Sequence, residues 1–161
     1  MVRAEDIEDI GLFDGLKEDE LETIAALASR QKYQPDDIII TPENYTTYVY
    51  ILEDSNDAVR MEVPGKDGEP NLVVHTLSKG ETFAWTPLCR PYVRSTIARA
   101  IKPATVIIVN GMGLNKLMEE NEHIGHIIMK NLAGILSKRL AYVTVVLARE
   151  VQKLREKEPV R

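Results

Sequence analysis

Residues 80–96 bring a glycine turn, aromatic side chains and two arginines together in one short segment. They read Gly80-Glu81-Thr82-Phe83-Ala84-Trp85-Thr86-Pro87-Leu88-Cys89-Arg90-Pro91-Tyr92-Val93-Arg94-Ser95-Thr96. The segment lies in a region, from about residue 31 to residue 110, in which short β-rich runs alternate with turn clusters. Many short strands at near-regular spacing predict a β-sandwich or a barrel.

Six runs in this region carry the strand signal, and clusters rich in Pro, Gly, Asn and Asp separate them. The runs are residues 38–40, 48–52, 59–63, 72–77, 95–98 and 105–109. Residues 64–70 begin and end with proline and contain two glycines, which is typical of a hairpin tip.

Helical patterns flank the β region on both sides. In residues 1–30 the apolar residues recur at helical spacing, and Gly11 and Gly15 divide them into two short helices. Residues 113–157 contain no proline and predict a short helix from Leu114 to about Asn121, followed by a long helix. The sequence therefore predicts an α+β protein with helices at both ends of a β core.

The long helix carries an apolar stripe with near-heptad steps. Its residues are Ile128, Leu132, Leu136, Leu140, Val143, Leu147, Val151 and Leu154. The stripe is about 39 Å long at 1.5 Å per residue, which is more than packing on one small β domain requires. A projecting apolar seam usually pairs with a second copy of itself. We expect a homodimer through Leu132, Leu136, Leu140, Val143, Leu147 and Val151.

Composition narrows the class of protein. The 161 residues fit a single domain, and 20 Lys+Arg against 25 Asp+Glu give a net charge of −5, which opposes nucleic-acid binding. The one cysteine, Cys89, fits a reducing compartment. The N-terminus turns acidic at once and lacks the apolar stretch of a signal peptide, and the apolar runs are shorter than a membrane span. We expect a soluble, cytoplasmic protein with neither nucleic acid nor membrane as a partner.

The sequence contains none of the common catalytic motifs, such as GxxxxGK[ST], HExxH, GxSxG or GxGxxG. His123 and His126 lie near three glutamates and could bind a metal ion together, but a solvated acidic helix junction is the favoured interpretation. Cys89 beside Arg90 is either a reactive thiol or a small packed residue, and packing is favoured. We therefore expect no enzymatic activity and no bound metal.

The order of helices, β region and long helix, together with residues 80–96, resembles the cyclic nucleotide-binding domain family. This family forms the sensory half of catabolite-activator-type (Crp/Fnr) regulators. Its phosphate-binding cassette reads roughly Gly-Glu/Asp-x-Phe-Gly-Glu-x-x-Leu, then a short helix, then Arg-Ser/Thr/Ala. Leu12-Phe13-x-x-Leu16 resembles the family's entry helix, and Tyr50-Ile51-Leu52 resembles its central strand. The similarity covers about residues 10–150.

The resemblance implies a fold and a division of the chain. The fold is a jelly-roll-like β-roll (a double-stranded β-helix) of eight strands in residues 31–110. N-terminal helices occupy residues 1–30, and residues 113–157 hold the C-terminal helices, including the one for dimerisation. The whole chain, 1–161, would then be one domain with no DNA-binding domain, because no helix-turn-helix follows the long helix.

The resemblance also implies a site for a cyclic phosphate. Arg94 and Ser95 match the family's phosphate-binding pair, and Phe83 matches its apolar anchor. An arginine pairs with phosphate through charge-assisted hydrogen bonds. Arg90 could serve a different anion. Thr144 falls where relatives place a polar residue that touches the purine, although a packed threonine is favoured.

Two positions depart from the family pattern. Ala84 replaces the second glycine of the cassette, and Trp85 replaces the carboxylate that accepts a hydrogen bond from the ribose 2′-OH. An indole can only donate. Trp85 would therefore fill the ribose space or stack on a base, or it is an ordinary core residue. We expect 3′,5′-cyclic AMP to bind weakly or not at all.

The resemblance implies a stand-alone sensory or regulatory domain that binds a cyclic nucleotide or a related anionic molecule in an altered pocket. It would signal through a homodimer, with an effector protein as a further partner. One alternative is a degenerate domain of the same fold that serves as an interaction or dimerisation module. A cupin-like metal enzyme is disfavoured because only His75 lies on a predicted strand. A redox or haem sensor using Cys89 or His75 is a further alternative.

Overall fold

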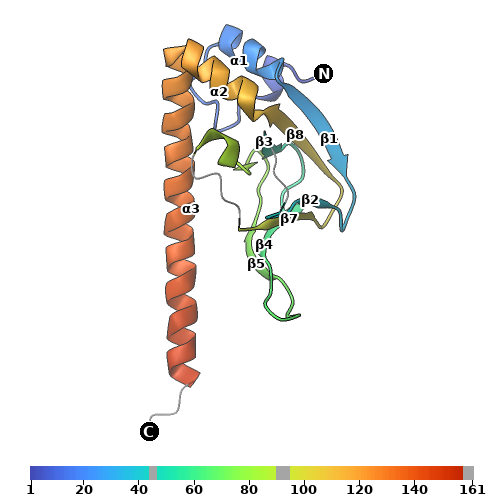
Figure 1. The fold of residues 1–161 in the computed structure, drawn as a ribbon, viewed down its shortest axis with the longest axis vertical. Helices are drawn as coiled ribbons and strands as arrows, with labels where there is room; N and C mark the ends of the chain where they lie inside the picture. Colours follow the sequence, from blue (N-terminus) through green and yellow to red (C-terminus); the bar gives the residue numbers. More distant parts are fainter. Residues whose placement is uncertain (44–46, 90–94, 158–161) are drawn as a thin grey trace.

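The computed structural model describes residues 1–43, 47–89 and 95–157. In these residues, eight strands form two four-stranded antiparallel sheets, ordered β1-β8-β3-β6 and β2-β7-β4-β5. The strands are β1 (Ala28–Tyr33), β2 (Ile38–Ile40), β3 (Tyr48–Leu52), β4 (Val59–Val63), β5 (Leu72–Thr76), β6 (Thr82–Phe83), β7 (Ile97–Ala100) and β8 (Ala104–Asn110). The helices are η1 (Ala4–Asp6), α1 (Glu18–Ala25), η2 (Thr86–Leu88), α2 (Gly111–Glu120) and α3 (Glu122–Lys157). The predicted α+β class with a β-roll is confirmed (Figure 1).

Strands β3 and β8 show how the sequence pattern builds the roll. They pair antiparallel with Tyr50 opposite Ile108, and alternate side chains on each strand point to opposite faces. One set packs under the helices: Val49, Ile51, Ile107 and Val109. The other set packs inside the roll: Tyr50, Leu52 and Val106. The two strands therefore contribute to two hydrophobic cores, one on each face.

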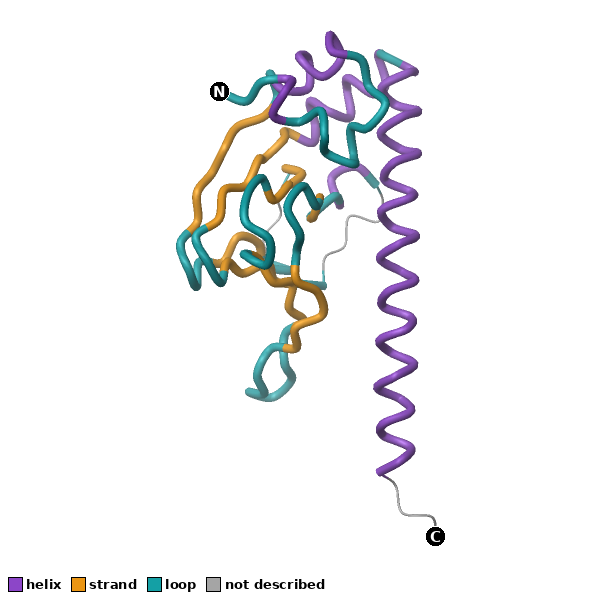
Figure 2. Tube along the Cα trace, turned by 180° about the vertical axis from the view of Figure 1, so that it is seen from behind, coloured by secondary structure: helices purple, strands orange, loops and turns teal. Residues whose placement is uncertain are grey.

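The helices cover one end of the roll, and α3 then continues past it (Figures 1 and 2). Ile128 and Leu132 in the first part of α3 are buried in the core beneath the helices. Farther along, Leu140 is 68% exposed and Leu147 is 62% exposed. The prediction that Leu132 belongs to the dimer interface is therefore corrected. Leu132 is 1% exposed within its own chain and offers almost no surface to a partner.

Element boundaries differ from the sequence-based expectations at the N-terminus and around β1. The first expected helix is only the 3₁₀ turn η1. Strand β1 was not expected, because its sequence Ala-Ser-Arg-Gln-Lys-Tyr is mostly polar. It pairs along the edge of β8 from Ala28 opposite Val109 to Tyr33 opposite Ala104. The β-roll therefore begins at Ala28, before residue 31.

The next differences lie at β6 and at the start of α2. Strand β6 has two residues, too few to show a periodic pattern. Helix α2 begins at Gly111, three residues earlier than expected. The Asn110 side chain caps it by accepting a hydrogen bond from the Gly113 backbone N–H at 3.0 Å.

Among the described residues, α3 is the one helix that is long and apolar enough to cross a membrane by length and composition. Its most apolar 18-residue window has a mean hydropathy of 1.3, and 6% of that window is buried. One such helix is weak evidence for a membrane span. A helix that pairs with a second chain also presents exposed apolar surface.

Candidate functional site

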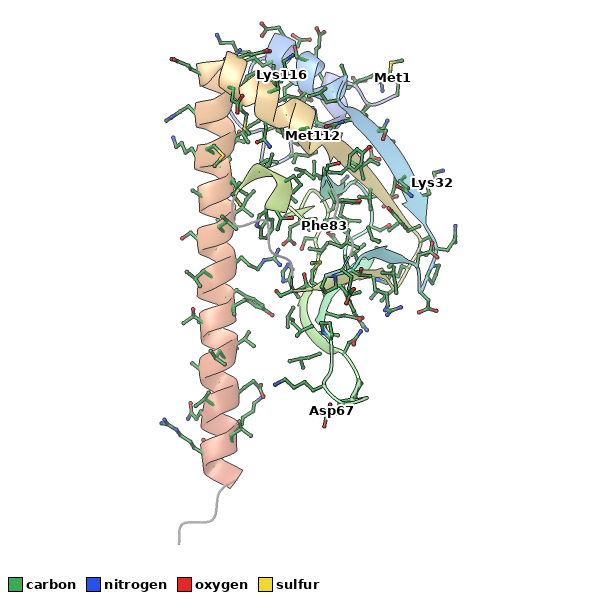
Figure 3. The ribbon with its side chains drawn as sticks, in the orientation of Figure 1. Met1, Lys32, Asp67, Phe83, Met112 and Lys116 are labelled. Atoms are coloured by element: carbon green, nitrogen blue, oxygen red, sulfur yellow. The ribbon has the colours of Figure 1, made fainter. Side chains whose placement is uncertain are left out.

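A pocket of about 230 Å³ opens between the β-roll and α3. Phe83, labelled in Figure 3, lies inside the roll and forms part of the wall together with Ile40 and Val74. One further residue each from β4 and β5, the segment that follows β6, the two residues just before β7 and two residues of α3 complete the lining. Ser95 and Arg139 supply polar atoms there. The pocket is thus lined mainly by apolar side chains and carries the Arg139 guanidinium on the α3 side.

Arg139 joins α3 to the segment around residues 80–85. Its Nη2 donates a hydrogen bond to Oε1 of Glu81 and forms an ion pair with that carboxylate. Its guanidinium carbon lies 5.6 Å from the centre of the Trp85 ring, within range of a cation–π interaction. The side chains of Arg139 and Glu81 are 20% and 23% exposed. The pair is therefore largely shielded from water.

Glu81 has two further polar partners. Nε2 of His75 lies 2.7 Å from Oε1 of Glu81, and the backbone N–H of Ser78 donates to Oε2 at 3.0 Å. The His75 ring also meets the Tyr142 ring of α3 edge-on, with 5.7 Å between ring centres. Two α3 side chains thus contact the roll around one carboxylate. We call this cluster the Glu81 clasp: Glu81, His75, Arg139 and Tyr142.

Glu81 and Arg139 are both charged at neutral pH. Partial burial disfavours the Glu81 carboxylate, but hydrogen bonds from His75 and Ser78 and the charge of Arg139 outweigh burial. The pKa of Glu81 is therefore held below its ordinary value of 4.5. Burial lowers the pKa of Arg139, and the neighbouring Glu81 carboxylate opposes that shift. An arginine nevertheless stays protonated in proteins, so the two groups form an ion pair at neutral pH.

No protein-family model matches the chain, and no curated protein matches it. Solved structures do match. One from Geobacter metallireducens GS-15, described as a cyclic nucleotide-binding protein, is 23% identical. The match covers 87% of this chain and 99% of that one, with a TM-score of 0.73. A cyclic nucleotide-binding domain from Methylobacillus flagellatus KT has 13% identity, coverages of 91% and 83%, and a TM-score of 0.78. The chain has the cyclic nucleotide-binding domain fold.

A larger regulator shares this cyclic nucleotide-binding fold. The catabolite activator protein of Thermus thermophilus is 20% identical, with a TM-score of 0.70. The match covers 88% of this chain but only 63% of the activator, so the chain spans less than two thirds of that protein.

Within the cyclic nucleotide-binding fold, the pocket brings together four of the predicted site residues. These are Phe83, Ala84, Trp85 and Ser95. Phe83 is buried and packs on Tyr50, with 5.6 Å between ring centres. Their role toward a ligand stays a prediction. Arg90 and Arg94 lie outside the described residues.

The resemblance implies that Ala84 occupies the second glycine position of the cassette, and the Ala84 backbone has a conformation that suits glycine. Its φ is +54°, in the left-handed region that glycine adopts most easily. The cassette turn therefore keeps a conformation suited to glycine although the glycine is replaced.

Thr144 does not line this pocket. It is exposed on α3, and its hydroxyl donates to the Leu140 carbonyl of the same helix at 2.8 Å. Arg139 and Val143 are the α3 residues that reach the pocket. No contact between Thr144 and a ligand in its own chain's pocket is supported.

The Glu81 clasp was not predicted from the sequence. Arg139 lies four residues before Val143, so the two share a helix face, and this spacing could have placed Arg139 at the pocket. Glu81 lies within residues 80–96 but was assigned no role. His75 was considered only as a strand histidine of a cupin-like metal enzyme or as part of a redox or haem sensor.

The structure also describes the surroundings of two other candidates from the sequence, a metal site near His123 and a reactive thiol at Cys89. Nδ1 of His123 lies 2.8 Å from Oε1 of Glu20, which joins α3 to α1. Within the described part of the chain, no group of three His, Cys, Asp or Glu side chains could hold a metal ion.

Cys89 packs partly buried against the core beneath the helices, and burial raises the pKa of its thiol. Since the thiolate is the reactive form, this environment disfavours a reactive cysteine.

Proposed function

We propose that this chain is a non-enzymatic regulatory domain that binds a small anionic, nucleotide-type ligand in the pocket between the cassette and α3. The observation that carries the proposal is the placement of Arg139 and Trp85 at one pocket, where a cation and an aromatic face meet. An anionic group can pair with the guanidinium, and a base can stack on an aromatic ring. The matched structures from Geobacter metallireducens and Methylobacillus flagellatus, a cyclic nucleotide-binding protein and a cyclic nucleotide-binding domain, point to the same ligand class.

In this proposal Arg94 and Ser95 bind the phosphate, as the cassette resemblance implies. Ser95 lines the pocket, and Arg94 precedes it directly in the chain. The domain signals as a homodimer through the exposed part of α3. A chain with one cysteine fits the cytoplasm, where thiols stay reduced.

A second candidate function is a dimerisation or interaction module that binds no nucleotide. The ion pair between Arg139 and Glu81 favours it, because the guanidinium at the pocket is already matched by a carboxylate of the same chain. The pocket volume of about 230 Å³ also lies below the range of about 300–1,000 Å³ that is typical of ligand sites.

Tryptophan fluorescence separates the two candidates, because Trp85 is the single tryptophan of the chain and lines the pocket. Cyclic mononucleotides and cyclic dinucleotides are titrated in turn, with free N-acetyltryptophanamide as the correction for absorption by the bases. A saturable change in emission is expected for at least one compound. If emission shows no saturable change up to millimolar ligand and calorimetry detects no heat of binding, the second candidate is favoured. The chain would then be a dimerisation or interaction module that binds no nucleotide.

Arg94→Ala tests the assignment of the phosphate group. If the pair with phosphate is buried, its loss weakens binding by about 2–5 kcal/mol, and Lys restores only part because it lacks the planar fork. Unchanged affinity in Arg94→Ala would show that the cassette alignment is wrong.

A further inference from the structure

Arg139 is the one arginine or lysine that lines the pocket among the residues that the structure describes. Its charge is already matched by a carboxylate of the same chain, because its Nη2 donates to Glu81. The pair is largely shielded from water, so solvent screens the attraction less than at an open surface. A ligand anion therefore meets a guanidinium that is already occupied.

Glu81 can release Arg139 without losing all of its partners. Oε1 keeps His75 within 2.7 Å, and Oε2 keeps the backbone N–H of Ser78 at 3.0 Å. Arg139 in turn keeps the face of Trp85 as a second partner. Both groups thus remain partly satisfied after separation, which makes an exchange of partners physically accessible.

We propose that Glu81 is an internal competitor for Arg139, so that an anion entering the pocket must take the guanidinium from Glu81. This inference rests on the proposed function, since it concerns how the same pocket receives its anion. Glu81 sets the threshold affinity for anions, and Arg139 is the residue that changes partner. Ligands with a compact, strongly charged anionic group compete best, because they replace the charge-assisted hydrogen bond that Arg139 gives up.

The test compares wild type with Glu81→Gln, using inorganic phosphate and 3′,5′-cyclic AMP as probes. The glutamine keeps the shape and an acceptor for the Ser78 N–H, but it removes the competing charge. Trp85 emission reports binding directly because Arg139 lies over the indole. Ionic strength is held constant with chloride. We expect Glu81→Gln to bind phosphate about tenfold more tightly, which corresponds to about 1.4 kcal/mol.

Two further variants make the test specific. Glu53→Gln is the matched control, because Glu53 also pairs with an arginine, Arg30, but does not line this pocket. It changes net charge equally and should leave affinity unchanged. Glu81→Gln combined with Arg139→Gln should lose the whole gain, and thermal melting confirms that each variant is folded.

The outcomes separate the inference from the proposed function. Binding in wild type that Glu81→Gln leaves equal or weaker overturns the competition and keeps the regulatory ligand site. Binding in Glu81→Gln alone supports the competition and contradicts a working ligand site in the native chain. If the gain in affinity persists in Glu81→Gln combined with Arg139→Gln, the exchange of partners by Arg139 is overturned. If neither wild type nor Glu81→Gln binds a probe, both the competition and the proposed ligand site are overturned.

Discussion

Ala84 carries a φ of +54°, a conformation that costs a residue with a side chain about 1–2 kcal/mol. Glycine removes that strain but has about 0.5–1 kcal/mol more backbone entropy to lose on folding. We expect Ala84→Gly to raise the free energy of unfolding by about 0.5–1 kcal/mol, the difference between these two effects. Urea unfolding at fixed protein concentration measures it.

Ala133→Gly is the control for that stability measurement. Ala133 is exposed in the middle of α3, where glycine lowers stability by about 1 kcal/mol. The same substitution should therefore have opposite signs at the two positions. If both variants lost stability, the turn at Ala84 would not be strained.

Trp85 governs the predicted weak binding of 3′,5′-cyclic AMP. The cassette resemblance implies that it stands where relatives place the ribose-binding carboxylate. A lost charged hydrogen bond is worth about 1.5–3 kcal/mol, and a ribose hydroxyl left buried without a partner adds to that cost. We expect affinity to fall by one to three decades, at about 1.4 kcal/mol per decade, compared with a site that keeps the carboxylate. Calorimetry on wild type and on Trp85→Glu with Ala84→Gly tests this. Micromolar or tighter binding by wild type would show that Trp85 does not close the site.

Sequence could predict the cassette residues but not their surroundings. Phe83, Ala84 and Trp85 meet at the pocket because they are consecutive in the chain, and Ser95 lines it from ten residues farther along. Arg139 is 58 residues away from Glu81, and such a contact depends on where α3 crosses the roll. No local pattern contains that crossing.

At the scale of elements, the Glu81 clasp holds α3 against the roll where the helix leaves the core. Because the pKa of Glu81 is lowered on folding, its ionised form stabilises the folded protein at pH above 4.5, its ordinary value. That contribution is lost as the pH falls through the folded pKa. We expect the difference in unfolding free energy between wild type and Glu81→Gln to be largest near neutral pH. It should shrink in acid, as measured by urea unfolding across pH 3–7. A constant difference would exclude the lowered pKa.

The elements differ in how well their sequences reveal them. Strands β3 and β8 are continuous apolar runs buried on both faces, so the sequence predicts them directly. Strand β1 is exposed over most of its length, and β8 is the one strand it pairs with in the described residues. Burial creates the apolar signal, and a strand that is formed by pairing with a neighbour escapes a search for that signal.

At the scale of the whole molecule, the apolar stripe of α3 divides into two parts. Ile128 and Leu132 complete the core of their own chain, whereas Leu140, Leu147 and Leu154 are each more than 60% exposed. Burying a leucine contributes about 1.5–3 kcal/mol. A second copy of the helix, paired along the exposed part, would bury these leucines in both chains at once.

Leu147→Glu tests the homodimer without disturbing the fold. Leu147 lies far beyond the last α3 residue of the core, so its replacement should leave the unfolding of the roll unchanged. In a dimer, the carboxylate would lie unpaired in the seam, and burying such a charge is costly. We expect wild type to sediment as a dimer at micromolar concentration and Leu147→Glu to sediment as a monomer.

Val145→Glu is the matched control for the dimer. Val145 is also exposed and apolar, but two residues along a helix rotate it to the opposite side from Leu147. It should stay dimeric if the seam is the interface. Leu132→Glu should instead unfold the protein, because Leu132 is buried in its own chain. These three positions separate pairing through the seam from unspecific association of apolar surface, which would weaken equally with Leu147→Glu and Val145→Glu. A monomeric wild type at micromolar concentration would remove the homodimer from the proposed function.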